Sequence, residues 1–222
     1  MMHTLTSLYI LSSVFLFFFL IREYVAYKRY LTLKYFFTPS LTLILVMIMI
    51  LSIIMYGADR YRLLILFSLL AALVADTLMM IEEITFIKNG MIFFMMAHLF
   101  YIGAFSIDAS FQLWNTVIIL ILFILSFLFI RMMNRNAGKM IVPVVIYVLI
   151  INMMAYFAIT SFNKGFSASG IMVAAGAVLF MLSDFVLSIN AFVKKIKYST
   201  VYTWLLYAPA QLLFVLSAFS CR

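Results

Sequence analysis

The sequence predicts an all-α, polytopic membrane protein in which residues 1–222 form a single transmembrane domain. Hydrophobic residues make up 68% of the 222 residues and charged residues only 10%, and the mean hydropathy is +1.23. A soluble domain of this size could not bury so much apolar surface. The apolar residues also fall into runs of the roughly 17–25 residues that a helix needs to cross a bilayer.

Eight such runs follow one another with short connections, and each is expected to form one transmembrane helix. They cover residues 5–21, 39–56, 62–81, 90–107, 112–131, 140–160, 168–190 and 200–219. The first run has no basic segment before it and no small-residue cleavage site, so we interpret it as a helix and not as a signal peptide. Pro39 and Pro143 suit the first turns of the second and sixth helices, where a missing N–H is no loss. Pro209 lies inside the eighth helix and should bend it.

The basic residues between the runs predict the orientation in the membrane. Eleven of the 15 Lys and Arg residues follow the first, third, fifth and seventh helices: Arg22, Lys28, Arg29, Lys34, Lys88, Arg131, Arg135, Lys139, Lys194, Lys195 and Lys197. The other side carries Arg60, Arg62, Lys164 and Arg222. Cytoplasmic loops are enriched in Lys and Arg. We therefore expect the richer side to face the cytoplasm and both termini to lie outside, in a bacterial inner (cell) membrane. The net charge of +8 indicates topology and not nucleic-acid binding.

Two aspartates, Asp76 and Asp184, lie inside predicted spans. In each case a small residue precedes the aspartate, and aliphatic residues follow it. A charge near the centre of a bilayer costs about 2.5–3.5 kcal/mol on insertion scales, so such residues usually have a function. At a rise of about 1.5 Å per residue, both aspartates should lie roughly 10 Å, or about six residues, from the cytoplasmic ends of their helices. The repeated local pattern also suggests a four-plus-four internal duplication.

Four further polar side chains are predicted at a similar depth. His98 and Tyr101 are three residues apart on the fourth helix, and Tyr207 and Gln211 are four apart on the eighth, so each pair shares a face. Polar groups at this depth must face protein or a wet cavity. They could line a site with the aspartates, or they could only form hydrogen bonds between helices.

Several kinds of chemistry have no support in the sequence. No Cys/His cluster has the spacing of metal ligands, and no Gly-rich phosphate loop or G-x-S-x-G motif is present. Cys221 is the only cysteine, so no disulfide can form within the chain. We therefore expect no metal site.

Four segments, taken in order, resemble the YhhN-like lysoplasmalogenase family. They read ADTLMM, FIKNGMIFFMMAHLFYIGAF, GAVLFMLSDFVLSINAF and YAPAQLLF, and they resemble the family motifs GD-x-x-L, H-x-x-Y, SD-x-x-L-x-x-N and Y-x-x-A-Q. Two positions depart from the family. Ala75 stands where the family has Gly, and a Lys-Pro pair at the start of the second helix reads Thr38-Pro39. If that lysine contacts a lipid phosphate in the family, this chain lacks the contact.

The resemblance implies hydrolysis of the vinyl-ether bond of lysoplasmalogens, without a cofactor, to a fatty aldehyde and glycerophosphocholine or glycerophosphoethanolamine. The expected partners are then a lysophospholipid substrate and membrane lipids. Such hydrolysis begins with protonation of the β-carbon, which creates an oxocarbenium-like cation. It therefore needs a neutral carboxylic acid and a nearby anion. We predict that Asp76 and Asp184 supply these two groups, in an order that the sequence leaves open, because burial and mutual repulsion keep one of two close carboxyls protonated.

The remaining polar residues would then have supporting roles. Those expected to orient water or the glycerol hydroxyl are His98, Tyr101, Tyr207 and Gln211. Those expected near the headgroup are Asn190, which could form a hydrogen bond there, and Lys194 and Lys195, which could attract the phosphate.

Two other classes of protein stay open. A proton-coupled transporter also uses pairs of aspartates within the membrane. A structural protein could instead pair Asp76 and Asp184 with another subunit.

Overall fold

The computed structural model describes residues 2–81, 84–134, 138–161 and 167–219, and these residues form helices without any strand. The α-helices are α1 (Met2–Lys28), α2 (Leu31–Tyr56), α3 (Arg60–Met79), α4 (Ile84–Phe105), α5 (Asn115–Asn134), α6 (Ile141–Thr160), α7 (Ala168–Ser188) and α8 (Ser199–Ser217). A 3-10 turn, η1 (Gly138–Met140), precedes α6, and a π-helical turn, η3 (Ile189–Val193), extends α7. The predicted all-α class is confirmed.

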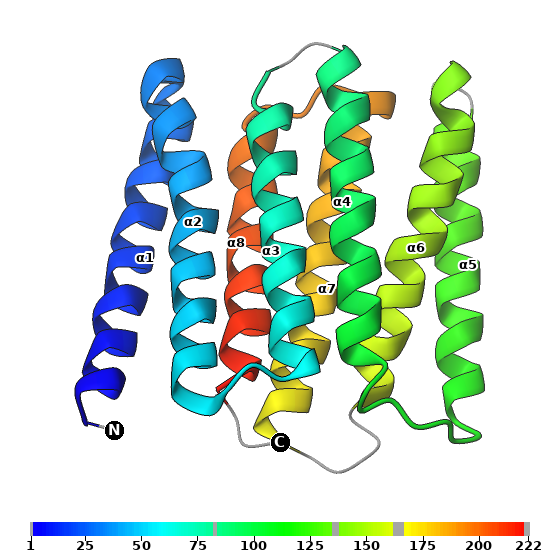
Figure 1. The fold of residues 1–222 in the computed structure, drawn as a ribbon. Helices are drawn as coiled ribbons and strands as arrows, with labels where there is room; N and C mark the ends of the chain where they lie inside the picture. Colours follow the sequence, from blue (N-terminus) through cyan, green and yellow to red (C-terminus); the bar gives the residue numbers. More distant parts are fainter. Residues whose placement is uncertain (1, 82–83, 135–137, 162–166, 220–222) are drawn as a thin grey trace.

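Successive helices run in opposite directions, side by side (Figure 1). Helix α1 lies at one edge of the bundle and α5 at the other, with α3, α4, α7 and α8 between them. The start of α1 and the end of α8 lie at the same end of the bundle, which we call the terminal end. The connections after α1, α3, α5 and α7 lie at the opposite end, which we call the basic end because the sequence places most Lys and Arg residues there.

Seven of the helices are long and apolar enough to cross a membrane, so the chain is an integral membrane protein. Helix α4 is not among the seven, and its sequence carries Lys88, Asn89 and His98. It nevertheless lies alongside the others in the bundle (Figure 1). Its crossing of the membrane and the four-plus-four duplication both stay predictions.

One predicted helix start was wrong. Helix α2 begins at Leu31, so Pro39 lies inside it and not in its first turn. The proline leaves the Tyr35 carbonyl without its helical donor, and the neighbouring Phe36 carbonyl accepts from the Ser40 hydroxyl at 2.7 Å. Pro143 lies in the first turn of α6, as predicted, and Pro209 lies inside α8. The bend expected at Pro209 stays a prediction.

The central helices approach closely where they carry small residues. A Cβ atom on Gly176 of α7 would come within 2.6 Å of the Phe214 ring and 3.1 Å of the Ala210 carbonyl oxygen on α8. Ala72 and Ala75, both fully buried on α3, belong to the same hydrophobic core. Without a hydrophobic force between helices in lipid, such close packing is a main source of their association.

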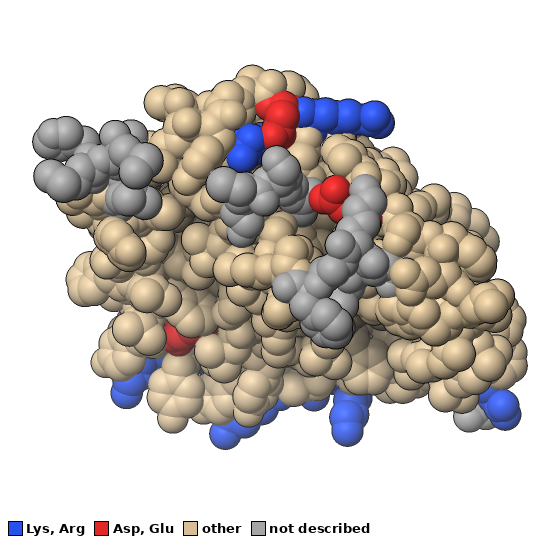
Figure 2. Space-filling view, turned by 90° about the horizontal axis from the view of Figure 1, so that it is seen from below, with Lys and Arg blue, Asp and Glu red and all other residues tan. Residues whose placement is uncertain are grey.

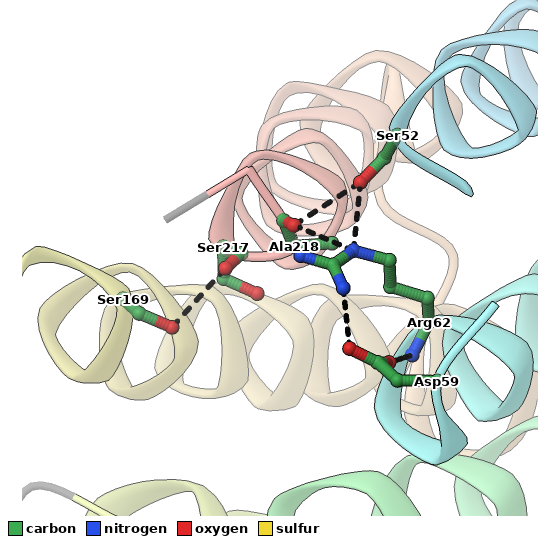
Figure 3. Close-up of polar contacts among 6 residues, drawn as sticks. All are labelled: Ser52, Asp59, Arg62, Ser169, Ser217 and Ala218. Atoms are coloured by element: carbon green, nitrogen blue, oxygen red, sulfur yellow. Dashed lines mark hydrogen bonds and ion pairs between the residues drawn. The ribbon is translucent and has the colours of Figure 1, made fainter. Parts of the chain in front are cut away.

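A network of hydrogen bonds joins four helices at the terminal end (Figure 3). Arg62 Nε on α3 donates to the Ser52 hydroxyl on α2 at 3.2 Å and to the Ala218 carbonyl after α8 at 3.1 Å. Arg62 Nη1 pairs with Asp59, and the Ser169 hydroxyl on α7 donates to the Ser217 carbonyl at 3.2 Å. These contacts satisfy carbonyl groups that the end of α8 leaves without helical partners.

Most of the surface seen from the terminal end is uncharged, and the Lys and Arg side chains in this view lie at its rims (Figure 2). Arg135, Lys164 and Arg222 lie outside the described residues. Arg62, counted among the basic residues of this side, is buried in the network just described. Which face of the bundle meets the cytoplasm stays a prediction.

Candidate functional site

Asp76 lies near the basic end of the bundle, three residues before α3 ends at Met79 and therefore closer to the helix end than predicted. Its side chain is buried and accepts two hydrogen bonds on Oδ2, from the Thr42 hydroxyl at 2.6 Å and the Tyr207 hydroxyl at 3.0 Å. Among the described residues, none donates to Oδ1. Helices α2 and α8 therefore fix one carboxyl oxygen and leave the other available.

Three predicted residues, Tyr101, Gln211 and Tyr207, are linked by consecutive hydrogen bonds that end at this carboxyl. The Tyr101 hydroxyl on α4 donates to Oε1 of Gln211, and Gln211 Nε2 donates to the Tyr207 hydroxyl at 3.0 Å. Tyr207 in turn donates to Asp76, so every donor in the chain points toward the carboxyl. Tyr101 and Gln211 are fully buried, and their contacts therefore position Tyr207.

Asp184 has separate partners. The Tyr147 hydroxyl on α6 donates to Asp184 Oδ2 at 2.6 Å, and His98 Nε2 lies 3.6 Å from the same oxygen. Tyr147 and His98 are themselves 3.3 Å apart. Because the phenol has one proton and donates it to Asp184, the imidazole must donate from Nε2 in this contact. His98 Nδ1 is buried and has no hydrogen-bond partner among the described residues.

The ring of Phe180 lies between the two groups of polar residues. Its centroid is 4.8 Å from that of His98 and 5.2 Å from that of Tyr207. Within the described residues, no hydrogen bond joins Asp76 to Asp184. The structure therefore gives each carboxyl its own hydrogen-bond partners.

Both aspartates nevertheless line the same cavity, which has a volume of about 550 Å³. Tyr147 and Tyr207 also line it, as do polar residues of α2, α8 and the connection between α7 and α8. Such a volume is within the usual range for small-molecule sites. Helices α3 and α7 therefore each contribute a carboxyl group to one hollow.

An apolar groove of about 420 Å³ adjoins the cavity, between α5, α6 and α7. Side chains such as Leu125, Ile151 and Leu182 line it. Tyr147 and Asp184 line both the groove and the cavity. The two hollows therefore meet at a carboxyl group, which suits a ligand with an apolar tail and a polar head.

The residues predicted near the headgroup separate in the structure. Asn190 and Lys195 line the cavity, whereas Lys194 is exposed and lies outside its lining. The Asn190 side-chain oxygen accepts from the Ile196 N–H at 2.9 Å and so closes the turn after η3.

Sequence reasoning missed Thr42 and Tyr147, the hydroxyl donors to the two aspartates from α2 and α6. Each lies in a long apolar run that carries other hydroxyl side chains as well, so neither stands out in the sequence. The available signal was that Tyr147 stands near the middle of its predicted span, away from the interfaces where tyrosines usually serve as anchors.

Comparison with known proteins finds a similar protein and a matching family model for this chain. It is 36% identical over 154 residues to a mouse (Mus musculus) protein named lysoplasmalogenase TMEM86B, and the match covers 68% of this chain and 61% of that protein. No solved structure matches the chain. Residues 33–218 match the sequence model of the YhhN family. This match spans both aspartates and all four motifs, and the chain therefore belongs to the YhhN family.

Proposed function

We propose that this chain is an intramembrane hydrolase that cleaves the vinyl-ether bond of lysoplasmalogens, releasing a fatty aldehyde and glycerophosphocholine or glycerophosphoethanolamine. The observation that carries the proposal is the meeting of an apolar groove and a polar cavity at Asp184, with Asp76 on the same cavity. The name of the mouse relative supports the same reaction.

The proposed substrate lies with its alkenyl chain in the groove and its glycerol and headgroup in the cavity. Because the tail exchanges one apolar environment for another within the membrane, close packing in the groove positions it rather than hydrophobic transfer from water. With the tail in the groove, the vinyl ether lies next to Asp184, where the two hollows join.

In this pose Asp184 acts as the general acid. It protonates the β-carbon of the vinyl ether, and the positive charge is shared between the adjacent carbon and the ether oxygen. Tyr147 holds Oδ2 of Asp184, and Oδ1 delivers the proton in this scheme. General acid catalysis of this kind contributes about 100- to 10,000-fold in rate.

Asp76 then acts as the base for water. Thr42 and Tyr207 hold its Oδ2, and Oδ1 orients a water molecule toward the cationic carbon. Water adds and its proton passes to Asp76. The hemiacetal then collapses to aldehyde and alcohol as Asp76 protonates the leaving oxygen and Asp184 takes the hydroxyl proton, which returns both carboxyls to their starting states. Glycosidases divide acid and base roles between two carboxyls on a similar cation. His98, Tyr101 and Gln211 are positioning residues in this scheme.

The test is release of aldehyde by the purified protein in detergent. We expect aldehyde from a 1-alkenyl lysophospholipid and none from the saturated 1-alkyl ether of the same chain length, because the saturated ether cannot form the cation by carbon protonation. Absence of aldehyde from both lipids would overturn the proposal. Substrate-dependent proton uptake without aldehyde would favour a transporter instead.

We also propose that the basic end faces the cytoplasm, in the inner membrane if the chain is bacterial. Cys221 is the only cysteine, so a membrane-impermeant maleimide should label it in intact cells. A Lys197→Cys protein in a Cys221→Ser background should react only after permeabilisation. The reverse labelling pattern would show that the basic end faces away from the cytoplasm.

A further inference from the structure

One end of the cavity carries buried polar groups that the proposed acid–base chemistry does not use. Thr38 on α2 is 2% exposed and Thr203 on α8 is 9% exposed, and both line the cavity. Neither hydroxyl has a hydrogen-bond partner among the described residues. Buried hydroxyls without partners are rare in native proteins, and two of them on one cavity indicate a missing ligand group or water.

A buried arginine lies beside these threonines. Arg22, near the end of α1, has no exposed surface, and its guanidinium carbon is 4.5 Å from the centre of the Trp204 ring. Its Nη1 donates to the Thr200 carbonyl at 3.2 Å and pairs with Glu23 at 2.6 Å. Thr200 and Trp204 both line the cavity, so the guanidinium is adjacent to the cavity.

The rest of this guanidinium is unsatisfied. Nε and Nη2 of Arg22 are buried and have no partner within the described part of the chain. These two nitrogens form one edge of the guanidinium, the fork that binds two oxygens of a carboxylate or phosphate. Burying such donors without an acceptor is unfavourable, which points to an anionic group as the missing partner.

The other charges on the cavity also fit an anion. Lys34 and Lys195 line the cavity, and with Arg22 they give three cations at its basic end, against Glu23 beside the arginine. Thr38 and Thr203 lie one helical turn nearer the basic end than Thr42 and Tyr207, the two residues that hold Asp76. An anion bound by the two threonines would therefore be separated from the Asp76 carboxyl by about 6 Å along the helices.

We propose that Arg22, Thr38 and Thr203 form a subsite for the phosphate group of the lysophospholipid. The two hydroxyls donate to the non-bridging oxygens, and the free edge of Arg22 balances the negative charge. This inference rests on the proposed function, because it places the headgroup end of the same substrate. It assigns a binding role to residues of α1, α2 and α8 that catalysis does not require.

Lipid binding, followed by the fluorescence of Trp204, tests this subsite without any hydrolysis. The chain has two tryptophans, so a Trp114→Phe protein reports on the cavity alone. It is titrated with a saturated 1-alkyl lysophosphoethanolamine and with the 1-alkylglycerol of the same chain length, which lacks phosphate. We expect the phosphate-bearing lipid to bind at least about tenfold more tightly, since hydrogen bonds to charged groups are the strong ones.

Threonine variants then locate the effect. Thr38→Val and Thr203→Val keep the shape of the side chain but remove the hydroxyl, and each should reduce the preference for the phosphate-bearing lipid about tenfold. Thr77→Val is the matched control, because Thr77 is exposed on α3 and its hydroxyl bonds within its own helix to Leu73 at 2.8 Å. It should keep the full preference.

Three results would overturn the inference. Equal affinity for the two lipids in the parent protein would mean that the orphan groups only hold water. Equal losses for both lipids in the threonine variants would indicate a structural role. Quenching by inorganic phosphate alone, at the concentration at which the lipid acts, would assign the site to a free anion. Because the ligands cannot be hydrolysed, a phosphate preference without aldehyde release would leave this subsite standing while the proposed reaction failed.

Discussion

Each end of the bundle buries one arginine, and the two arginines differ in how many hydrogen-bond acceptors the chain supplies to them. At the terminal end, Arg62 donates to Ser52 and Ala218 and pairs with Asp59, so the chain itself supplies its acceptors (Figure 3). At the basic end, Arg22 has acceptors for Nη1 only, and a whole edge of its guanidinium has none within the described residues.

This difference distinguishes a structural arginine from one that is available to a ligand. A buried charge that is satisfied by its own chain ties helices together, and removing it leaves its partners orphaned. A buried charge beside a cavity that lacks acceptors for some of its N–H groups can form the missing hydrogen bonds with a ligand. The same distinction holds for the aspartates at the two ends, because both oxygens of Asp59 accept from Arg62, whereas only Oδ2 of Asp76 accepts hydrogen bonds within the described residues.

The largest expected effect is on the aspartates. Asp76→Asn and Asp184→Asn should each lower the rate of aldehyde release by about 100- to 10,000-fold, because each removes an acid or base group while keeping the side-chain volume. Asp59→Asn at the terminal end should lower thermal stability in detergent but leave turnover per folded molecule unchanged. Full turnover in either cavity variant would remove that aspartate from the mechanism.

The phenols that hold the two carboxyls should have the next largest effect. Tyr147→Phe and Tyr207→Phe each remove one hydrogen bond to an aspartate, at 2.6 and 3.0 Å, and kcat should fall about tenfold or more with little change in KM. Tyr61→Phe removes the 2.5 Å contact with Ser217 and should affect only the unfolding temperature. A change in KM without a change in kcat would mean that the phenols bind substrate and do not position the carboxyls.

Arg62→Gln should act on stability alone. It leaves the Ser52 hydroxyl and the Ala218 carbonyl with fewer partners, and each unsatisfied buried group costs about 1–3 kcal/mol. Thermal unfolding in detergent would measure the loss, and aldehyde release per folded molecule should stay at the parent value. If the Arg62→Gln variant is as stable as the parent protein, the hydrogen-bond network does not stabilise the end of α8.

The smallest expected effect is at Ser169. Its hydroxyl donates one 3.2 Å bond to the Ser217 carbonyl, and Ser169→Ala should lower the free energy of unfolding by about 0.5–1.5 kcal/mol. Turnover per folded molecule should not change. A fall in turnover would show that the terminal end also affects the reaction, which would contradict the separation of the two ends.

Much of the fold could be predicted from composition and run length, because a bilayer requires helices of a certain length. The start of α2 could not, since residues 31–38 include Lys34 and several aromatic residues, which are as typical of an interface as of a helix. Arg22 was expected in a loop, but α1 continues to Lys28 and brings it against Trp204.

The site was predictable to a lesser degree. A charged residue in an apolar run is a strong signal, and Asp76 and Asp184 were found in this way. Thr42 and Tyr147 gave little signal, because a hydroxyl in a span gains significance only from its partner on another helix. The separate partners of the two carboxyls also depend on Phe180, whose position between them follows from packing and not from sequence spacing.

Hydrolysis in D₂O tests most directly whether a carboxylic acid protonates the substrate at carbon. The aldehyde, trapped at once by reduction with borohydride, should carry one deuterium on the carbon next to the carbonyl carbon, and Asp184→Asn should abolish its formation. An aldehyde released at the parent rate without deuterium at that carbon would contradict protonation at carbon and, with it, the assigned role of the aspartates.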